Sequence, residues 1–152
     1  MQDIASKCRQ EQGWFTPCSY DDLIASYGHE VLLQVDDKDY QGDTRALLRD
    51  GDKIGHLQFG WGSCSGCDAL QGCDSVEEVR ELQQQLHDQI RWFPNTAEAL
   101  AWFRSHDWKG EYSWHAEEQR EYIEKAIHVL SSDAAPLGAS RFEEQIDEPR
   151  PG

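Results

Sequence analysis

The sequence lacks a long hydrophobic run. No apolar stretch approaches the roughly 18 residues that a membrane-spanning helix needs. The first thirteen residues also carry four charges where a secretory signal peptide needs an apolar segment: Asp3, Lys7, Arg9 and Glu11. These absences predict a cytoplasmic protein with no membrane partner.

Basic residues are scarce. The chain has 14 lysines and arginines against 29 aspartates and glutamates, which gives a formal net charge of −15. Such a charge repels phosphate backbones, so we predict no direct binding to nucleic acid. The acidic excess has two interpretations. It is either a well-solvated surface, or a surface that offers carboxylates to a basic protein partner, including a protein that normally holds DNA or RNA.

Large apolar side chains are not lacking. Hydrophobic residues make up 38% and aromatic residues 11% of the 152 positions, and six residues are tryptophan, so the chain should fold around a core of its own. We predict one α+β domain over residues 1–131. The proline-containing segment at residues 132–152 is expected to be a flexible acidic tail.

Hydrophobic periodicity and turn residues predict the elements. Alternating apolar residues and the Asp50-Gly51 turn indicate an antiparallel meander with strands at Glu30–Val35, Thr44–Arg49 and Lys53–Trp61. Capping residues Ser19, Ser75 and Asn95 mark three helix starts. The full prediction is a three- to four-stranded antiparallel meander packed against three to four helices. The candidate helical segments are Asp3–Gln12, Tyr20–Tyr27, Ser75–Ile90, the residues after Asn95, and Ala116–Ser131. A further edge strand is expected at Trp108–Trp114.

The cysteines are odd in number. Five of them occur in a chain with no export signal, where thiols usually stay reduced, so metal ligation or thiol chemistry is favoured over structural disulfides. Three lie in the segment Gly60–Cys73, here named the Gly-Cys loop, which also contains four glycines and joins a predicted strand to a capped helix. Loops at such junctions commonly hold functional sites.

One interpretation of the Gly-Cys loop is a zinc site. Cys64 and Cys67 have the two-residue separation with which two thiolates hold one ion, and Cys73 is a third candidate ligand. Cys18 is the expected fourth ligand, with Cys8 or His56 as alternatives, because the chain has no second Cys-x-x-Cys pair.

Two other interpretations stay open. Gly62-Ser63-Cys64-Ser65-Gly66 has the outline of a nucleophile elbow, so Cys64 or Cys67 is a candidate nucleophile or redox thiol. Against this, the short chain and its antiparallel pattern do not match the folds that usually carry such motifs. In the third interpretation the cysteines only pack as small apolar residues.

Other candidate residues have simpler interpretations. The tryptophans are expected mainly in the core, unless Trp102, Trp108 and Trp114 form an exposed cluster, which would indicate a partner site. Asp36, Asp37 and Asp39 are close enough in sequence to suggest calcium ligands, but they lack the twelve-residue loop pattern. We expect those three in a solvated hairpin.

Two segments of the sequence resemble those of known small proteins. Tyr40-Gln41-Gly42-Asp43 followed by Gly60-Trp61-Gly62-Ser63-Cys64-Ser65-Gly66-Cys67-Asp68 is similar to a set of small, uncharacterised bacterial and phage proteins with a Tyr-x-Gly-Asp segment and a Gly-aromatic-Gly-Ser-Cys-Ser-Gly-Cys-Asp core. The resemblance covers about residues 40–74. It implies a microbial or viral origin and supplies no catalytic residue.

Charge, size and this resemblance together predict a function. The expectation is a small acidic protein, derived from a phage, that binds another protein and inhibits or regulates host machinery for nucleic-acid handling or defence. The alternative is a cysteine-dependent enzyme or thiol redox protein that uses the Gly-Cys loop. The cofactor expected from the metal-site interpretation of the loop is zinc, held by Cys64, Cys67, Cys73 and Cys18.

Overall fold

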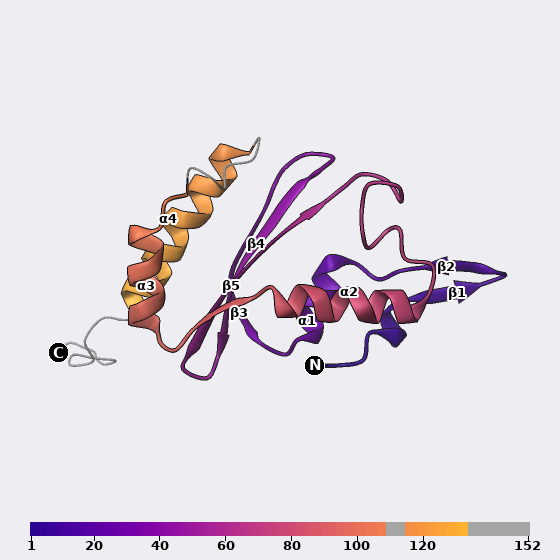
Figure 1. Cartoon of the computed structure of the whole chain (residues 1–152), viewed down its shortest axis with the longest axis horizontal. Coiled ribbons are helices and arrows are strands. Elements are labelled where there is room, and N and C mark those ends of the chain that lie inside the picture. Colours follow the sequence, from indigo (N-terminus) through magenta and orange to yellow (C-terminus); the bar gives the residue numbers. More distant parts are fainter. Residues whose placement is uncertain (109–114, 134–152) are drawn as a thin grey trace.

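A four-stranded antiparallel sheet forms the middle of the structure (Figure 1). The computed structural model describes residues 1–108 and 115–133. The strands lie in the order β3-β4-β5-β6, which is also their order in the chain. Their bounds are Glu30–Asp36 for β3, Gly42–Asp50 for β4, Lys53–Trp61 for β5 and Arg91–Phe93 for β6. The α+β fold and the antiparallel meander predicted from the sequence are confirmed.

Helices cover both faces of this sheet, so the fold has three layers (Figure 1). Helices α1 (Tyr20–Ser26) and α2 (Val76–Asp88) pack on one face, and α3 (Thr96–Ser105) and α4 (Ala116–Asp133) on the other. Helix α4 includes two residues that we had assigned to the tail, Ser132 and Asp133. The rest of that segment, residues 134–152, lies outside the described part of the chain.

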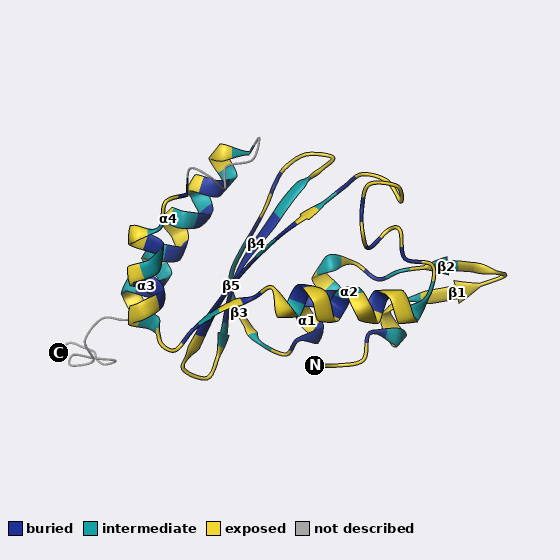
Figure 2. Ribbon diagram, in the orientation of Figure 1, coloured by how far each residue is buried: buried dark blue, intermediate teal, exposed yellow. Residues whose placement is uncertain are grey.

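Successive side chains of β4 and β5 point to opposite faces of the sheet, so each strand contributes to a separate core on each face. Ala46 and Leu48 point to the α1 and α2 side, whereas Leu47 between them points to α3 and α4. Both cores are fully closed at their centres: Leu23, Leu57 and Val79 on the first side and Ile54, Ala99 and Tyr122 on the second have no exposed surface. Figure 2 shows the matching pattern, with the buried side of each helix turned toward the sheet.

The predicted helix caps are present. Ser19 and Asp22 form a complete capping box at α1, and Asn95 accepts the backbone N–H of Glu98 at α3. At α2 the hydroxyl of Ser75 accepts the N–H of Glu78, while the Glu78 carboxylate accepts the N–H of Asp74 rather than that of Ser75. These local contacts explain why three of the helix starts were predictable.

The N-terminal segment differs from its prediction. In place of a helix at Asp3–Gln12, a short 3₁₀ turn (Ala5–Lys7) leads into a two-stranded hairpin of β1 (Arg9–Glu11) and β2 (Trp14–Thr16). Gln12 and Gly13 both have positive φ, 50° and 83°, and reverse the chain there. The helix prediction was wrong because Arg9–Glu11 pairs with Trp14–Thr16 across this turn, and a segment this short gains little from forming a helix on its own.

Two further outcomes concern the edge of the sheet. The strand predicted at Trp108–Trp114 falls largely on residues 109–114, outside the described part, although Trp108 itself is buried. The fourth strand of the sheet is instead β6, which pairs Ile54 with Phe93.

None of the helices in residues 1–108 and 115–133 combines the length and apolar character that crossing a bilayer requires.

Candidate functional site

The Gly-Cys loop follows β5 and brings two exposed cysteines together. The sulfurs of Cys64 and Cys67 lie 2.8 Å apart, and both residues are free thiols. A tight turn produces this contact, since the backbone N–H groups of Cys67 and Asp68 both donate to the carbonyl of Cys64. Helix α2 begins only at Val76, so Cys64 does not occupy the sharp strand-to-helix turn of a nucleophile elbow.

A buried carboxylate holds the loop in shape. Asp68 is 3% exposed, and its Oδ1 accepts the backbone N–H of Gly62 at 2.8 Å. Its Oδ2 accepts the N–H of Gln71 at 2.8 Å and the hydroxyl of Tyr20, on α1, at 3.1 Å. Asp68 therefore ties both ends of the cysteine turn to the first layer of helices.

Gly62 provides the close approach that the turn needs. A β-carbon at this position would lie 2.5 Å from the carbonyl oxygen of Cys67 and 2.7 Å from its sulfur. Both distances are shorter than carbon atoms tolerate, so a side chain here would displace Cys67. The contrasting case is Gly66, whose added β-carbon would meet only the Cys64 sulfur, at 4.0 Å.

The surroundings of Cys67 favour its thiolate. Hydrogen bonding from the Cys64 thiol, together with the backbone N–H groups of Cys64 and Ser63, lowers the pKa of Cys67 below its usual range. The N–H of Cys64 reaches the Cys67 sulfur at 3.1 Å. Because the thiolate is the reactive form and Cys67 is exposed, this residue has the properties of a nucleophile.

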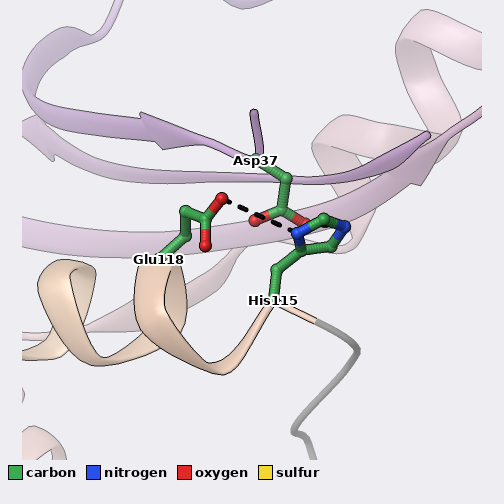
Figure 3. Close-up of side chains that lie close together, drawn as sticks. All are labelled: Asp37, His115 and Glu118. Carbon is green, nitrogen blue, oxygen red and sulfur yellow. Dashed lines mark ion pairs between the residues drawn. The ribbon is translucent and has the colours of Figure 1, made fainter. Parts of the chain in front are cut away.

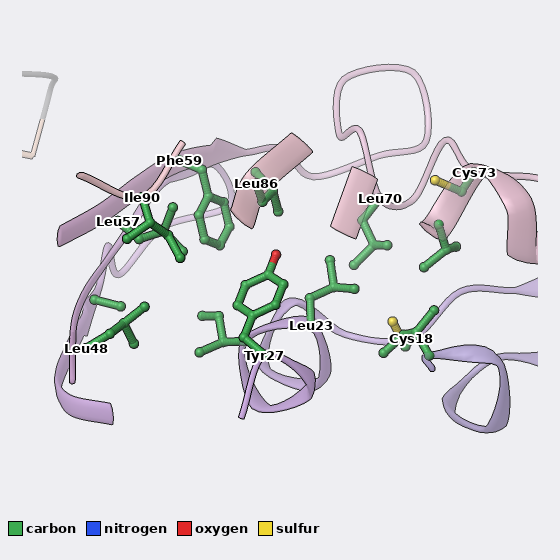
Figure 4. Packing of buried hydrophobic residues seen from close by; sticks show 14 residues of the cluster. Cys18, Leu23, Tyr27, Leu48, Leu57, Phe59, Leu70, Cys73, Leu86 and Ile90 are labelled. Atoms are coloured by element: carbon green, nitrogen blue, oxygen red, sulfur yellow. The ribbon is translucent and has the colours of Figure 1, made fainter. Parts of the chain in front are cut away.

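The other predicted zinc ligands lie in a different environment. Cys18 and Cys73 are buried at the rim of the first core, where Figure 4 shows them beyond Leu23 and Leu70. Burial raises the pKa of Cys18 to about 12 and also raises that of Cys73, whose thiol donates to the carbonyl of Ala69. Both side chains therefore have the character of protonated packing thiols.

The five cysteines thus divide into two groups. Cys64 and Cys67 form the exposed pair, whereas Cys8, Cys18 and Cys73 pack at the first core, with the Cys8 thiol beside that of Cys18. Among the described residues, no three cysteine sulfurs lie within 4.8 Å of one another. His56, considered as an alternative fourth ligand, is on the opposite face of the sheet, where its Nδ1 contacts the hydroxyl of Tyr122 at 2.7 Å.

A groove of about 470 Å³ lies beside the cysteine turn. One wall is the chain from Phe15 to Tyr20, and the other is formed by residues of the loop, among them Ser65, which stands between the two cysteines. Phe15, Pro17 and Leu70 make part of this lining apolar. Cys64 and Cys67 themselves do not line this groove, so it borders the cysteine turn only through Ser65 and Asp68.

A second cluster of polar groups lies at the end of β3, and the sequence analysis missed it. Asp37 is not in a solvated hairpin: its side chain is fully buried and pairs with the equally buried Arg45 at 2.7 Å. His115 and Glu118, at the start of α4, approach the same carboxylate, as Figure 3 shows. The solvated interpretation of Asp37 was wrong because α4, nearly eighty positions later, covers it.

The Tyr-x-Gly-Asp segment builds the other side of this cluster. A β-carbon on Gly42 would lie 2.5 Å from the β-carbon of Asp37, so the two residues fit only because Gly42 has no side chain. The N–H of Asp43 donates to Oδ2 of Asp37 at 2.7 Å. The sequence signal nearest to this cluster was the group Asp36, Asp37 and Asp39, considered above as calcium ligands.

Tryptophans in the described part pack rather than form an exposed cluster. Trp108 is 7% exposed and, with Trp102, contacts the ring of His56. The exception is Trp14, which is 76% exposed on the β1–β2 hairpin. Trp114 lies outside the described residues.

Comparisons with protein-family models, with curated proteins and with solved structures found no match for this chain. The resemblance to small bacterial and phage proteins therefore stays an expectation.

Proposed function

We propose that the protein performs thiol–disulfide exchange at Cys64 and Cys67, with Cys67 as the attacking thiolate and Cys64 as the resolving thiol. The observation that supports this proposal is the 2.8 Å contact between two exposed sulfurs, one of which receives hydrogen bonds that lower its pKa. In contrast to Cys18 and Cys73, this pair is accessible to a substrate.

The exchange conserves atoms and electrons. The Cys67 thiolate attacks one sulfur of a substrate disulfide, forms a mixed disulfide and releases the other sulfur as a thiolate. Cys64 then loses its proton and attacks the Cys67 sulfur, which releases the second substrate sulfur. Two electrons pass to the substrate, and Cys64 and Cys67 become a disulfide. A small dithiol or another protein dithiol restores the reduced pair.

The test follows the redox state of each cysteine. Protein equilibrated in mixtures of reduced and oxidised glutathione is quenched with acid, alkylated and analysed by peptide mass spectrometry. We expect a single disulfide between Cys64 and Cys67, with Cys18 and Cys73 alkylated only after denaturation. In the reduced protein, Cys67 should react with iodoacetamide at least about tenfold faster than either buried thiol near neutral pH.

Two variants sharpen this test. Cys64→Ser should leave Cys67 able to form a mixed disulfide with glutathione that is not resolved. Cys67→Ser should remove both the fast alkylation and the mixed disulfide. Equal, slow labelling of all five cysteines, or oxidation that joins Cys64 and Cys67 to the other cysteines at random, would contradict the proposal.

Zinc is the rival occupant of the same thiols. Metal analysis of protein purified without chelator distinguishes the two functions. About one zinc per chain, with Cys64 and Cys67 protected from alkylation until the zinc is removed, would favour the metal site over exchange. Recruitment of Cys73 and Cys18 as the remaining ligands would require both buried side chains to move toward the exposed pair.

Protein binding through the acidic surface is the second candidate function. It is favoured by the net charge of −15 and by two large aromatic side chains that are unusually exposed, Trp14 at 76% and Tyr40 at 84%. A basic partner captured by the wild-type chain should be lost as the salt concentration rises and retained less well by Trp14→Ala or Tyr40→Ala. Binding unaffected by salt and by both substitutions would contradict this function.

A further inference from the structure

The cluster at the end of β3 has the composition and spacing of a metal site. One ligand atom from each of Asp37, His115 and Glu118 lies within 4.8 Å of the other two. These residues come from two elements that the fold brings together, since Asp37 directly follows β3 and the other two lie at the start of α4. Figure 3 shows the side chains of Asp37, His115 and Glu118 pointing toward one another.

The three side chains approach one another closely. Nδ1 of His115 lies 3.6 Å from Glu118 and Nε2 of the same ring lies 3.9 Å from Asp37, so an ion bound by one of these nitrogens requires the ring to turn toward the other carboxylate. Both exceed the usual length of a hydrogen bond, about 3 Å. Two ligands bound to one ion at about 2.0–2.2 Å are themselves separated by roughly 3–3.5 Å, so small side-chain rotations would close the site.

The hydrogen bonds of Asp37 leave room for an ion. Oδ1 is occupied by Arg45, whereas Oδ2 accepts only the N–H of Asp43 among the described residues and retains a second lone pair. Gly42 and the N–H of Asp43 fix the orientation of this carboxylate, and the N–H of Lys38 fixes that of Glu118 at 3.1 Å. Ligands held by outer contacts in this way are typical of metal sites.

The buried network behind the cluster also has unused donors. Nη2 of Arg45 and Nε2 of Gln119 are buried, and neither has an acceptor among the described residues. Both belong to the hydrogen-bonded chain that leads from Gln119 through Arg45 to Asp37. These two donors require an acceptor oxygen, and the waters of a hydrated cation are donors, so an ion beside Asp37 would be held by the carboxylates and the imidazole rather than by this network.

We propose that a divalent transition-metal ion binds between Asp37, His115 and Glu118. The two carboxylates are negatively charged and attract a cation, although the Arg45 guanidinium offsets part of the charge of Asp37. The imidazole selects transition metals such as Mn²⁺ or Zn²⁺ over Mg²⁺ and Ca²⁺, which prefer oxygen ligands alone. Asp39, whose carboxylate lies 3.7 Å from Nε2 of His115, is available as a further ligand. This site is separate from the thiol pair.

Mn²⁺ is the probe for the test, because it prefers oxygen and imidazole ligands and does not compete well for thiolates. Titration of the full chain with MnCl₂, followed by the electron paramagnetic resonance of free Mn²⁺ and by calorimetry, should show one site per chain. His115→Gln and Glu118→Gln should each raise the Kd by at least about tenfold. Glu117→Gln, an exposed neighbour on the same turn of α4, should leave it unchanged.

Several results would overturn the proposal. One is the absence of a stoichiometric site; another is a set of weak sites that respond equally to all three substitutions, which is the behaviour of a generally acidic surface. Circular dichroism checks that each variant folds. If His115→Gln does not fold, Glu118→Gln decides alone, and an unchanged Kd in that variant rejects the site.

Discussion

The backbone N–H of Gly62 donates a 2.8 Å hydrogen bond to Oδ1 of Asp68, and this contact closes the cysteine turn. The two residues lie on either side of Cys64 and Cys67, so the bond fixes the ends of the segment that carries both thiols. Since Oδ2 of the same carboxylate contacts Tyr20 on α1, the exposed thiol pair is anchored to the core of the protein.

Asp68→Ala should loosen this anchor. The substitution leaves the N–H groups of Gly62 and Gln71 and the hydroxyl of Tyr20 without their acceptor. Because the site is partly buried, we expect the free energy of unfolding to fall by about 2–3 kcal/mol. The rate of Cys67 alkylation should fall toward that of an ordinary thiol. Urea unfolding and timed iodoacetamide labelling measure the two effects, with the exposed Asp74→Ala as the matched control.

Gly62→Ala tests the close approach of the loop to Cys67. The new methyl group would lie 2.7 Å from the Cys67 sulfur and 2.5 Å from its carbonyl oxygen, so the turn must shift. We expect the 2.8 Å sulfur contact to be lost and the Cys64–Cys67 disulfide to form at a more oxidising glutathione ratio. Gly66→Ala adds the same methyl group where it meets only one atom, at 4.0 Å, and should behave as wild type. Identical behaviour of the two variants would contradict the argument.

The Gly-Cys loop shows what the sequence could and could not predict. Its place between a strand and a helix, and the pairing of Cys64 with Cys67, follow from spacing of only a few residues. The role of Asp68 depends on Tyr20, which is 48 positions away and has no signature in the sequence. A local hint did exist, since Asp68 accepts the N–H of Gln71 in the manner of a helix cap.

The same distinction holds for the rest of the fold. The central strands and the caps at Ser19 and Asn95 depend on local patterns and were predicted correctly. Strand β6 has only three residues and exists because Phe93 pairs with Ile54, which no local pattern reveals. Burial of Asp37 likewise depends on α4 folding over the end of β3, so a local pattern of aspartates was misleading.

Arg45→Met tests the buried ion pair. Both side chains are fully buried, so the substitution leaves the Asp37 carboxylate as an unpaired charge in the interior. We expect a loss of about 3–5 kcal/mol in the free energy of unfolding. Arg49→Met, in a partly exposed pair with Asp133, should cost about 1 kcal/mol or less.

A double substitution separates charge from packing at this pair. Asp37→Asn with Arg45→Met removes both charges and should be more stable than Arg45→Met alone, because no unpaired charge is left inside. Denaturant unfolding of the wild type, Asp37→Asn, Arg45→Met and the double variant measures the coupling. If the double variant is as unstable as the sum of the single ones, packing rather than the ion pair holds this region.

His56 should make the protein less stable in acid. Its ring is enclosed by Trp102, Phe103 and Trp108, and this burial lowers its pKa to about 3. The Tyr122 hydroxyl gives its one proton to the carbonyl of Ala46, so Nδ1 of His56 is the donor in their 2.7 Å contact and the ring is neutral.

The sign of the effect follows from linkage. Between pH 6.5, the ordinary value, and about 3 the unfolded chain binds a proton at His56 that the folded chain does not bind. The free energy of unfolding should therefore fall with decreasing pH in this window, by up to about 1.4 kcal/mol per unit from this residue, and should be insensitive to it above pH 6.5. In His56→Gln, which keeps a side-chain donor for Tyr122, the slope between pH 6 and pH 4 should be smaller by about that amount. Urea unfolding at a series of pH values measures both slopes, and equal slopes would show that His56 takes up its proton in the folded state.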